Sequence, residues 1–152
     1  MRYSLDTSAL IEAWVRNYPP DVFPAFWSRL EDLIRSGDVA ASDEVLHELE
    51  ARDDDLFAWA KKQPCVFRSL DSVTQAAVSE VLDRYEHLVD TRGGSAADPF
   101  VIGFARVHGL TVVTMEKRTG NMDKPHIPDV CEGFGVRCIN LLGFIREMNW
   151  VF

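Results

Sequence analysis

The amino-acid sequence predicts an α/β fold, a three-layer α/β/α sandwich built around a short parallel sheet. Short apolar runs with the character of strands alternate along the chain with longer segments of helical periodicity. Strands that alternate with helices pair in parallel, and a parallel sheet is covered by helices on both faces. Several acidic residues also follow strands or begin helices, at the edge where such a sheet forms a crevice.

The composition is that of one soluble domain. The 152 residues predict a single domain, 1–152, and 47% of them are hydrophobic, which is enough for a substantial core. No apolar run approaches the roughly 18 residues needed to span a bilayer, and residues 1–6 lack the apolar core of a signal peptide. We therefore expect a cytoplasmic protein that does not enter a membrane.

The cysteine and histidine residues do not predict a disulfide framework or a zinc site. Three cysteines, Cys65, Cys131 and Cys138, are too few and odd in number for a disulfide framework. His126 with Cys131 and Cys138 lacks the paired C-x₂-C spacing that is typical of zinc sites. Any metal chemistry is therefore expected from oxygen ligands.

The net charge of −8 speaks against nucleic acid as a partner, because proteins that bind polyanions present basic surface. Two considerations reduce this objection. Acidic side chains that hold a metal ion lose their negative local field once the cation is bound. The remaining acidic surface is one that a basic segment of a partner protein would cover.

The first 37 residues predict a strand and two helices. Residues 2–6 form a short buried strand, after which Thr7 or Ser8 caps a helix with apolar side chains at helical spacing. A pair of prolines then breaks the chain. A strongly amphipathic helix follows over residues 23–34 and ends near Gly37, since glycine favours helix C-termini.

The middle of the chain continues the alternation of strands and helices. Residues 39–41 form a short second strand, and Ser42 caps the helix that follows it. Another helix covers residues 54–63, and residues 66–67 form a minor strand. Residues 71–90 predict a long helix, because their apolar positions fall along one side.

The last third of the chain predicts two helices, two strands and a long polar loop. A helix over residues 98–108 begins with an Asp–Pro pair, with aspartate at the cap and proline in the first turn. Residues 110–115 form a clear strand, and residues 116–128 are polar and proline-containing, which predicts a loop. Residues 136–139 form the last strand, and Asn140 caps the final helix.

Four acidic residues lie where the predicted strands end or the predicted helices begin. They are Asp6, Glu48, Asp98 and Glu116. If they converge on the carboxyl edge of the sheet, their charges repel one another unless a cation neutralises them. Carboxylate oxygens are the ligands that Mg²⁺ and Mn²⁺ prefer, so the sequence predicts a metal site and a metal-dependent nuclease.

For Asp6 and Glu48, a structural role is an alternative to a role as metal ligand. Asp6 could cap the following helix, but Thr7 and Ser8 are available for that, which favours Asp6 as a ligand. Glu44 and Glu48 lie four residues apart on one helix face. Glu48 is flanked by leucines near the core boundary, whereas Glu44 in the first turn could simply favour the helix dipole.

The other two acids are more ambiguous. An aspartate before a proline at a helix start is an ordinary N-cap, so Asp98 has a structural alternative. Glu116 opens a loop and could be a plain exposed side chain, and Asp123 is a second candidate ligand in that loop.

Basic residues lie close in sequence to these acids. Lys117, Arg118 and Lys124 share the loop after the fourth acid, and Arg92 precedes Asp98. Charged loops are often only solvated, but beside a metal site these side chains could contact phosphates. Aromatic residues at helical spacing are expected in the core: Trp14, Phe26, Trp27 and Phe104.

Taken together, the motifs resemble the PIN-domain ribonucleases, notably the VapC-type toxins of bacterial and archaeal toxin–antitoxin pairs. The resemblance rests on the order and spacing of four segments, namely residues 5–10, 41–49, 97–105 and 112–116. Residues 127–131 are similar to a less-characterised PIN-like subgroup.

The resemblance implies an acidic pocket that binds Mg²⁺ or Mn²⁺ and hydrolyses RNA phosphodiester bonds. Position by position, the acids of the family match the four acidic residues named above, and Thr7 or Thr114 could orient a water or a carboxylate. The chain departs from the usual Thr-x-Asp pattern at residues 114–116, where a glutamate takes the place of the aspartate. The loop after it is also extended.

An antitoxin protein is the partner that the resemblance implies. Such a partner could place an Arg or Lys against the acids and an amphipathic helix against Trp14, Phe23 and Trp27. A homodimer interface is an alternative use for the same aromatic residues.

Two other classes of function stay open. A haloacid-dehalogenase-type phosphotransfer enzyme or a receiver domain also places an aspartate after the first strand. The former requires a second aspartate where Ser8 stands, and the latter requires paired acids where only Asp6 qualifies. A catalytically silent PIN-like binding module is the other alternative, which the four retained acids disfavour.

Overall fold

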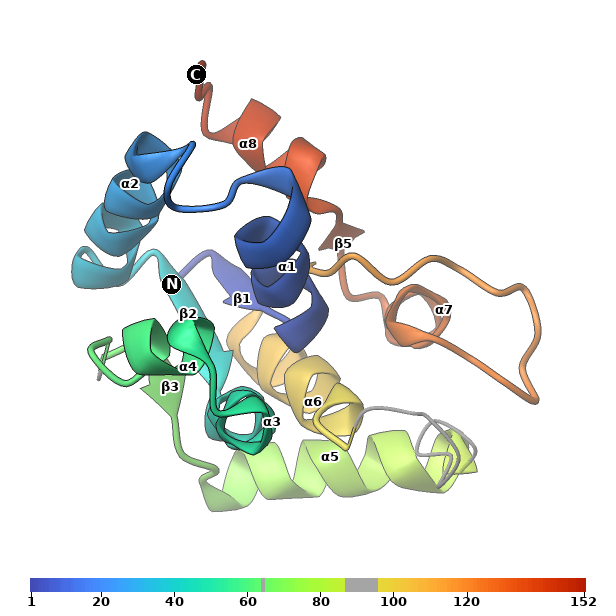
Figure 1. Ribbon diagram of the computed structural model, residues 1–152. Helices are drawn as coiled ribbons and strands as arrows, with labels where there is room; N and C mark the ends of the chain where they lie inside the picture. The colour runs from blue at the N-terminus through green and yellow to red at the C-terminus, as the bar shows by residue number, and fades with distance from the viewer. Residues whose placement is uncertain (64, 87–95) are drawn as a thin grey trace.

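The computed structural model describes residues 1–63, 65–86 and 96–152 (Figure 1). In this part of the chain five strands form one sheet, in the order β3-β2-β1-β4-β5, and every neighbouring pair is parallel. The strands are β1 (Tyr3–Leu5), β2 (Val39–Ser42), β3 (Phe67–Arg68), β4 (Thr111–Val113) and β5 (Cys138–Ile139). The predicted α/β class with a short parallel sheet is confirmed.

Helices connect the strands. They are α1 (Thr7–Glu12), a π-helical turn η1 (Ala13–Asn17), α2 (Pro24–Arg35), α3 (Asp43–Arg52), α4 (Asp55–Ala60), α5 (Ser72–Arg84), α6 (Asp98–His108), α7 (Ile127–Phe134) and α8 (Leu141–Glu147). The caps predicted at Ser42 and Asn140 are confirmed, because each side chain accepts a hydrogen bond from a first-turn amide. Of the described helices, none is both long and apolar enough to cross a membrane.

Helices cover both faces of the sheet. Helix α6 packs against β1, β2 and β4, and α5 lies alongside α6 on its outer side (Figure 1). On the opposite face, α1, α2 and α8 enclose an apolar core that contains Leu5, Phe26 and Phe144. Trp27 and Phe104 are also buried, as predicted, while Trp14 is partly buried against Trp27 with ring centroids 4.7 Å apart.

Helix α7 was not predicted. The expected loop over 116–128 ends earlier, because α7 begins at Ile127. Pro128 suggested a loop, but proline is tolerated in the first turn of a helix, where the amide has no intrahelical partner. Several other elements are also shorter than predicted: α5 ends at Arg84, β4 covers only Thr111–Val113 and β5 only Cys138–Ile139. Residues 87–90 of the predicted long helix lie outside the described residues.

The strand order fixes where the functional crevice lies. The chain runs from β1 outward to β2 and β3, and then returns to the other side of β1 with β4 and β5. This reversal makes the boundary between β1 and β4 the topological switch point. Ligands of open α/β sheets bind outside the carboxyl ends of the strands at such a point.

Candidate functional site

Asp6 lies at the switch point, directly after β1, and it is 1% exposed. Its Oδ2 accepts hydrogen bonds from the Ser8 hydroxyl at 2.5 Å and the Thr114 hydroxyl at 2.7 Å. The Ser8 backbone amide also donates to the same oxygen at 3.3 Å. The carboxylate is therefore held in one orientation by the first turn of α1 and by the residue that follows β4.

Ser8 and Thr114 tie the ends of β1 and β4 together. Their hydroxyl oxygens lie 3.0 Å apart. The Met115 amide donates to the Ser8 hydroxyl at 2.9 Å, and the Glu116 amide donates to the Thr114 hydroxyl at 3.1 Å. Sequence reasoning did not assign Ser8 to the site; its position two residues after a capping aspartate was the available signal.

The expected helix cap was wrong at this position. Asp6 itself is the N-cap of α1, with an extended backbone at φ −90° and ψ 155°, whereas Thr7 and Ser8 already belong to the helix. An N-cap needs this extended backbone, since its side chain must turn back to the first free amides. Capping α1 and facing the crevice are thus not alternatives for Asp6, because one carboxylate does both.

Burial raises the pKa of Asp6 to about 6. The hydrogen bonds from Ser8 and Thr114 act in the opposite direction, while the nearby negative charge of Glu116 raises the pKa further. A carboxylate that is removed from water costs free energy unless a partner charge compensates it. A positive charge placed beside this carboxylate would offset that cost.

Asp98 is buried at the start of α6, with 3% of its surface exposed. The prediction that it caps this helix was wrong: the N-cap is Ala97, and Asp98 is the first helical residue. The Ala97 amide instead donates to Oε1 of Glu48, at 3.1 Å. Glu48 on α3 thus reaches across to the helix start that carries Asp98.

Glu116 bridges β4 and α7. Its backbone follows the end of β4, and its Oε2 accepts a hydrogen bond from the Ile127 amide at 2.9 Å. Because Glu116 raises the pKa of Asp6, the two carboxyl groups share one electrostatic environment. The side chain is therefore built into the edge of the site, in contrast to the alternative of a plain exposed glutamate.

The auxiliary candidates occupy different environments. Glu44 approaches Nδ1 of His47, at 3.4 Å, on the outer side of α3. Asp123 is exposed in the loop before α7. The Thr7 hydroxyl is buried and, in the part of the chain that the structure describes, makes no hydrogen bond. Thr114 is the auxiliary residue that directly contacts one of the four acids.

The basic candidates lie on the exposed loop between β4 and α7. Lys117, Arg118 and Lys124 are all exposed there. Arg118 forms an ion pair with Glu132 of α7, at 2.9 Å, so part of its charge is already matched. Arg92 lies outside the described residues.

The donor atoms suit a hard divalent cation, although the side chains do not converge as a group. Within residues 1–63, 65–86 and 96–152, no three His, Cys, Asp or Glu side chains come close enough together to hold a metal. The contacts instead join Asp6 with Glu116, and Glu48 with the segment that begins at Asp98. Buried carboxylate oxygens at a switch point are the donor type that Mg²⁺ and Mn²⁺ prefer.

The fold and the comparisons with known proteins define the class. A solved structure of VapBC2 from Rickettsia felis, bound to a DNA fragment from their promoter, superimposes with a TM-score of 0.51. The match has 18% sequence identity and covers 92% of this chain and 98% of that chain. The protein therefore has a PIN-like α/β/α fold.

The family is defined more closely by sequence. The chain belongs to the family described as "Domain of unknown function (DUF4411)", whose model matches residues 3–152. No curated protein matches the chain.

Proposed function

We propose that this protein is a metal-dependent ribonuclease that hydrolyses RNA phosphodiester bonds. Asp6, Glu48, Asp98 and Glu116 would hold Mg²⁺ or Mn²⁺ at the carboxyl edge of the sheet. One observation carries the proposal: Asp6 is a buried carboxylate at the switch point, and it is fixed by two hydroxyl groups beside a second acid. The PIN-like fold supports the same reaction class.

The side chains of the site are oriented before any ligand binds. Ser8 and Thr114 hold Oδ2 of Asp6, and backbone amides at the starts of α6 and α7 hold one oxygen each of Glu48 and Glu116. These bonds fix the orientation of single carboxylates, but a cation would still have to draw the four acids together, because no three of them converge in the described chain. A bound divalent cation supplies Lewis-acid stabilisation of the charge that develops on the phosphate oxygens.

The direct test is cleavage of single-stranded RNA by the purified protein with Mg²⁺, Mn²⁺ or a chelator. We expect cleavage with either cation, none with the chelator, and none with Asp6→Asn. Asp21→Asn, at an exposed position on the turn before α2, removes the same charge and should leave activity intact. Cation binding by calorimetry without RNA cleavage would instead identify a silent PIN-like binding module.

We further propose that the protein acts as the toxin of a toxin–antitoxin pair. The proposal is supported by the resemblance of the sequence motifs to VapC-type toxins and by the structural similarity to VapBC2 from Rickettsia felis. The net charge of −8 and the acidic crevice suit an antitoxin segment that places an Arg or Lys against Asp6. Trp14 packs against Trp27, which is buried, so these two side chains contribute mainly to the core. They therefore offer little exposed surface to a partner helix.

The test of this partnership is co-expression with the product of a small neighbouring gene, followed by size-exclusion chromatography and the RNA assay. We expect a stable complex with suppressed cleavage. A homodimer that ignores the neighbouring product and stays active in its presence would contradict the antitoxin model. Growth arrest on expression that Asp6→Asn relieves would support it.

A further inference from the structure

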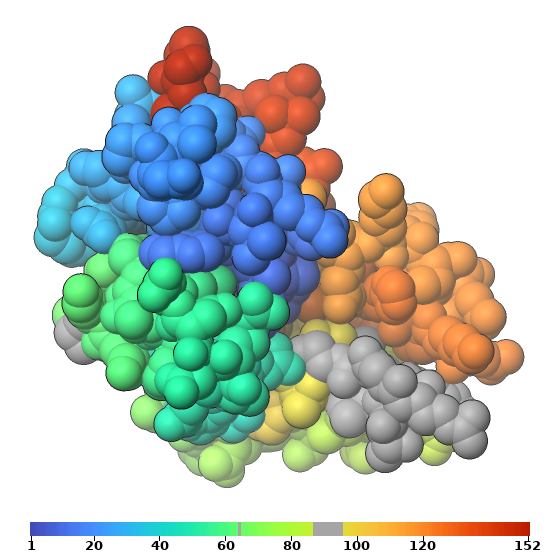
Figure 2. Space-filling view, in the orientation of Figure 1, coloured from blue at the N-terminus to red at the C-terminus, as the bar shows by residue number. Residues whose placement is uncertain are grey.

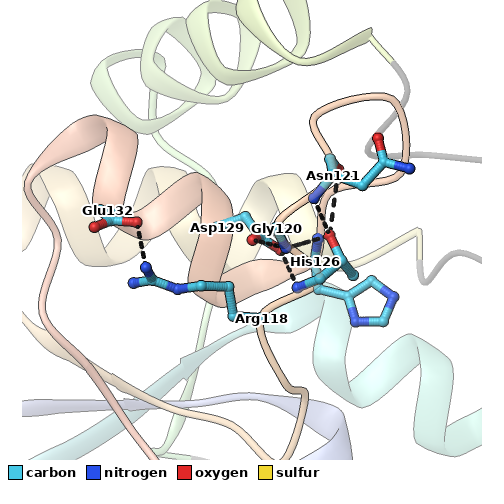
Figure 3. A network of polar contacts seen from close by, with 7 residues as sticks. Arg118, Gly120, Asn121, His126, Asp129 and Glu132 are labelled. Atoms are coloured by element: carbon cyan, nitrogen blue, oxygen red, sulfur yellow. Dashed lines mark hydrogen bonds and ion pairs between the residues drawn. The ribbon is translucent and has the colours of Figure 1, made fainter.

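Asp129, on the first turn of α7, organises the loop that precedes this helix. It is 3% exposed, and its carboxylate faces the loop over residues 116–126 (Figure 3). Oδ1 accepts from the Gly120 amide at 3.0 Å. Oδ2 accepts from the Thr119 amide at 3.0 Å, the Thr119 hydroxyl at 3.1 Å and the His126 amide at 2.9 Å.

Both oxygens of this carboxylate are thus used as acceptors by donors from two parts of the loop. Burial acts to raise the pKa of Asp129, but the bonds from the amides of Thr119, His126 and Gly120 outweigh it and hold the pKa below its usual value. Hydrogen bonds to a charged acceptor are stronger than those between neutral groups. Asp129 is therefore a firm anchor for a segment that is otherwise exposed.

The anchored segment is closed by further bonds. The Thr119 hydroxyl lies 3.0 Å from the carbonyl oxygen of Lys124, and the Asn121 amide donates to the Thr119 hydroxyl at 3.1 Å. At the other end, Nδ1 of His126 lies 3.0 Å from the carbonyl oxygen of Lys117. The positions of both lysines along the loop therefore depend on residues that Asp129 holds.

The loop is attached to the acidic site at its first residue. Glu116 begins the loop, and its carboxylate is bound by the amide of Ile127, the neighbour of His126. The hydrogen bond from the His126 amide to Asp129 therefore also positions the adjacent Ile127 amide, to which Glu116 is bound. Figure 2 shows the loop and α7 as an orange lobe beside the blue surface of α1, with a notch between them.

We propose that Asp129 is a positioning residue for RNA binding, which holds the loop so that Lys117 and Lys124 present their charges at the rim of the acidic site. This inference rests on the proposed ribonuclease function. Lys117 and Lys124 would contact phosphates, whereas Arg118 is matched by Glu132 on α7 and stabilises the loop against the helix. Asp129 itself touches the loop and not the substrate.

The first experiment measures the loop in the absence of RNA, by hydrogen exchange of the amides of Thr119, Gly120 and His126. In Asp129→Asn an NH₂ group replaces one of the two carboxylate oxygens. This group cannot accept a hydrogen bond, so at least one backbone amide of the loop loses its acceptor. We expect exchange at these amides to accelerate at least about tenfold, as the loss of one charge-assisted hydrogen bond implies. Asp21→Asn, which removes the same charge elsewhere, should exchange like the unmodified protein.

The second experiment measures binding of a single-stranded RNA oligonucleotide in the presence of a chelator. We expect the Kd of Asp129→Asn to rise about tenfold and its salt dependence to become shallower, because fewer phosphate contacts form. The kcat at saturating RNA and Mn²⁺ should change less than the Kd. A merely structural role would lower the active fraction, and hence kcat, without changing the Kd or the salt dependence.

Thr119→Val serves as a second variant, because an exposed hydroxyl can be removed without disturbing the core. It should shift exchange and Kd in the same direction by a smaller factor. RNA cleavage by the unmodified protein with unchanged RNA affinity in both variants would overturn this inference alone. Failure of the unmodified protein to bind or cleave RNA would overturn the proposed function, and this inference with it.

Discussion

Two buried aspartates begin helices at the same edge of the sheet, and they use their carboxylates in different ways. Asp6 caps α1 and receives three hydrogen bonds on one oxygen. Asp98 lies one residue inside α6, where Ala97 occupies the cap position. An aspartate beside a helix start is thus not a cap by default, since its role depends on whether its own backbone is extended or already helical.

The two glutamates of the site differ less from each other than the aspartates do. Glu48 and Glu116 each accept a backbone amide at the start of a neighbouring helix, α6 and α7 respectively. A negative charge near a helix N-terminus is stabilised by the free amides and by the helix dipole. Each glutamate is therefore oriented by a helix that it does not belong to, which only the tertiary structure could arrange.

The largest expected effect is the loss of RNA cleavage when either buried aspartate loses its charge. Asp98→Asn and Asp6→Asn should each lower RNA cleavage at least about 100-fold, because even changes behind metal ligands cost 10–100-fold. Circular dichroism should show an intact fold in both. Full activity of Asp98→Asn would remove Asp98 from the site, because the substitution deletes the carboxylate charge that a metal ligand needs.

The next largest effect is the pH dependence of the free energy of unfolding that Asp6 causes. Because the pKa of Asp6 rises from 3.8 to about 6 on folding, the folded state binds the extra proton between these values. Its contribution to the free energy of unfolding is thus retained below pH 4 and falls by about 3 kcal/mol as the pH rises through 6. Asp6→Asn should lack this fall.

The measurement is urea denaturation of both proteins without divalent cations between pH 4 and 7.5. The stability of Asp6→Asn relative to the unmodified protein should increase across this range. Asp21→Asn provides the control, since other acids contribute equally to all three proteins. A constant difference across the range would show that Asp6 is not a buried, proton-binding carboxyl group.

Cation binding should offset the cost of burying Asp6. At about 100 times its dissociation constant, Mn²⁺ or Mg²⁺ adds about 2.7 kcal/mol to the free energy of unfolding. For a chain of this length we expect the melting temperature to rise by about 5–10 °C. The rise should disappear in Asp6→Asn, and an equal rise in that variant would place the cation elsewhere.

Thr114→Val tests the bond that joins β4 to Asp6. Removing this hydroxyl deletes a hydrogen bond to a buried charge, which should cost about 2 kcal/mol at pH 7.5. The cost should be smaller at pH 5, where Asp6 is largely protonated. Thr111→Val, at the start of the same strand, is the matched control for urea denaturation, and an equal cost in both variants would contradict a specific role for Thr114.

The smallest stability change is expected at Glu48. In Glu48→Gln the side-chain oxygen can still accept the Ala97 amide, so the free energy of unfolding should change by about 1 kcal/mol or less. RNA cleavage should nevertheless fall strongly, because a carboxylate ligand is lost. Retained cleavage would reduce Glu48 to a structural support for the start of α6.

Much of the fold could be predicted from local patterns. Apolar periodicity and capping residues such as Ser42 and Asn140 marked most helices, and the alternation of strands and helices indicated the parallel sheet. The exception was α7, because Pro128 is equally compatible with a loop and with the first turn of a helix. The bond from the His126 amide to Asp129 is a local capping contact, but the bonds from Thr119 and Gly120 to Asp129 form only when the loop folds back on α7.

The sequence by itself determined the α/β class and the order of the acidic residues along the chain. It did so because periodicity and turn chemistry act over a few residues. Only the tertiary structure decided that β1 and β4 are neighbours, since strand order depends on packing between distant segments. That pairing brings Thr114 onto Asp6 across 108 positions of sequence, whereas the bond from Ser8 to Asp6 is local to the start of α1. The docking of α7 likewise brings Asp129 onto the Thr119 amide, because partners that are not neighbours in sequence meet only when the chain is folded.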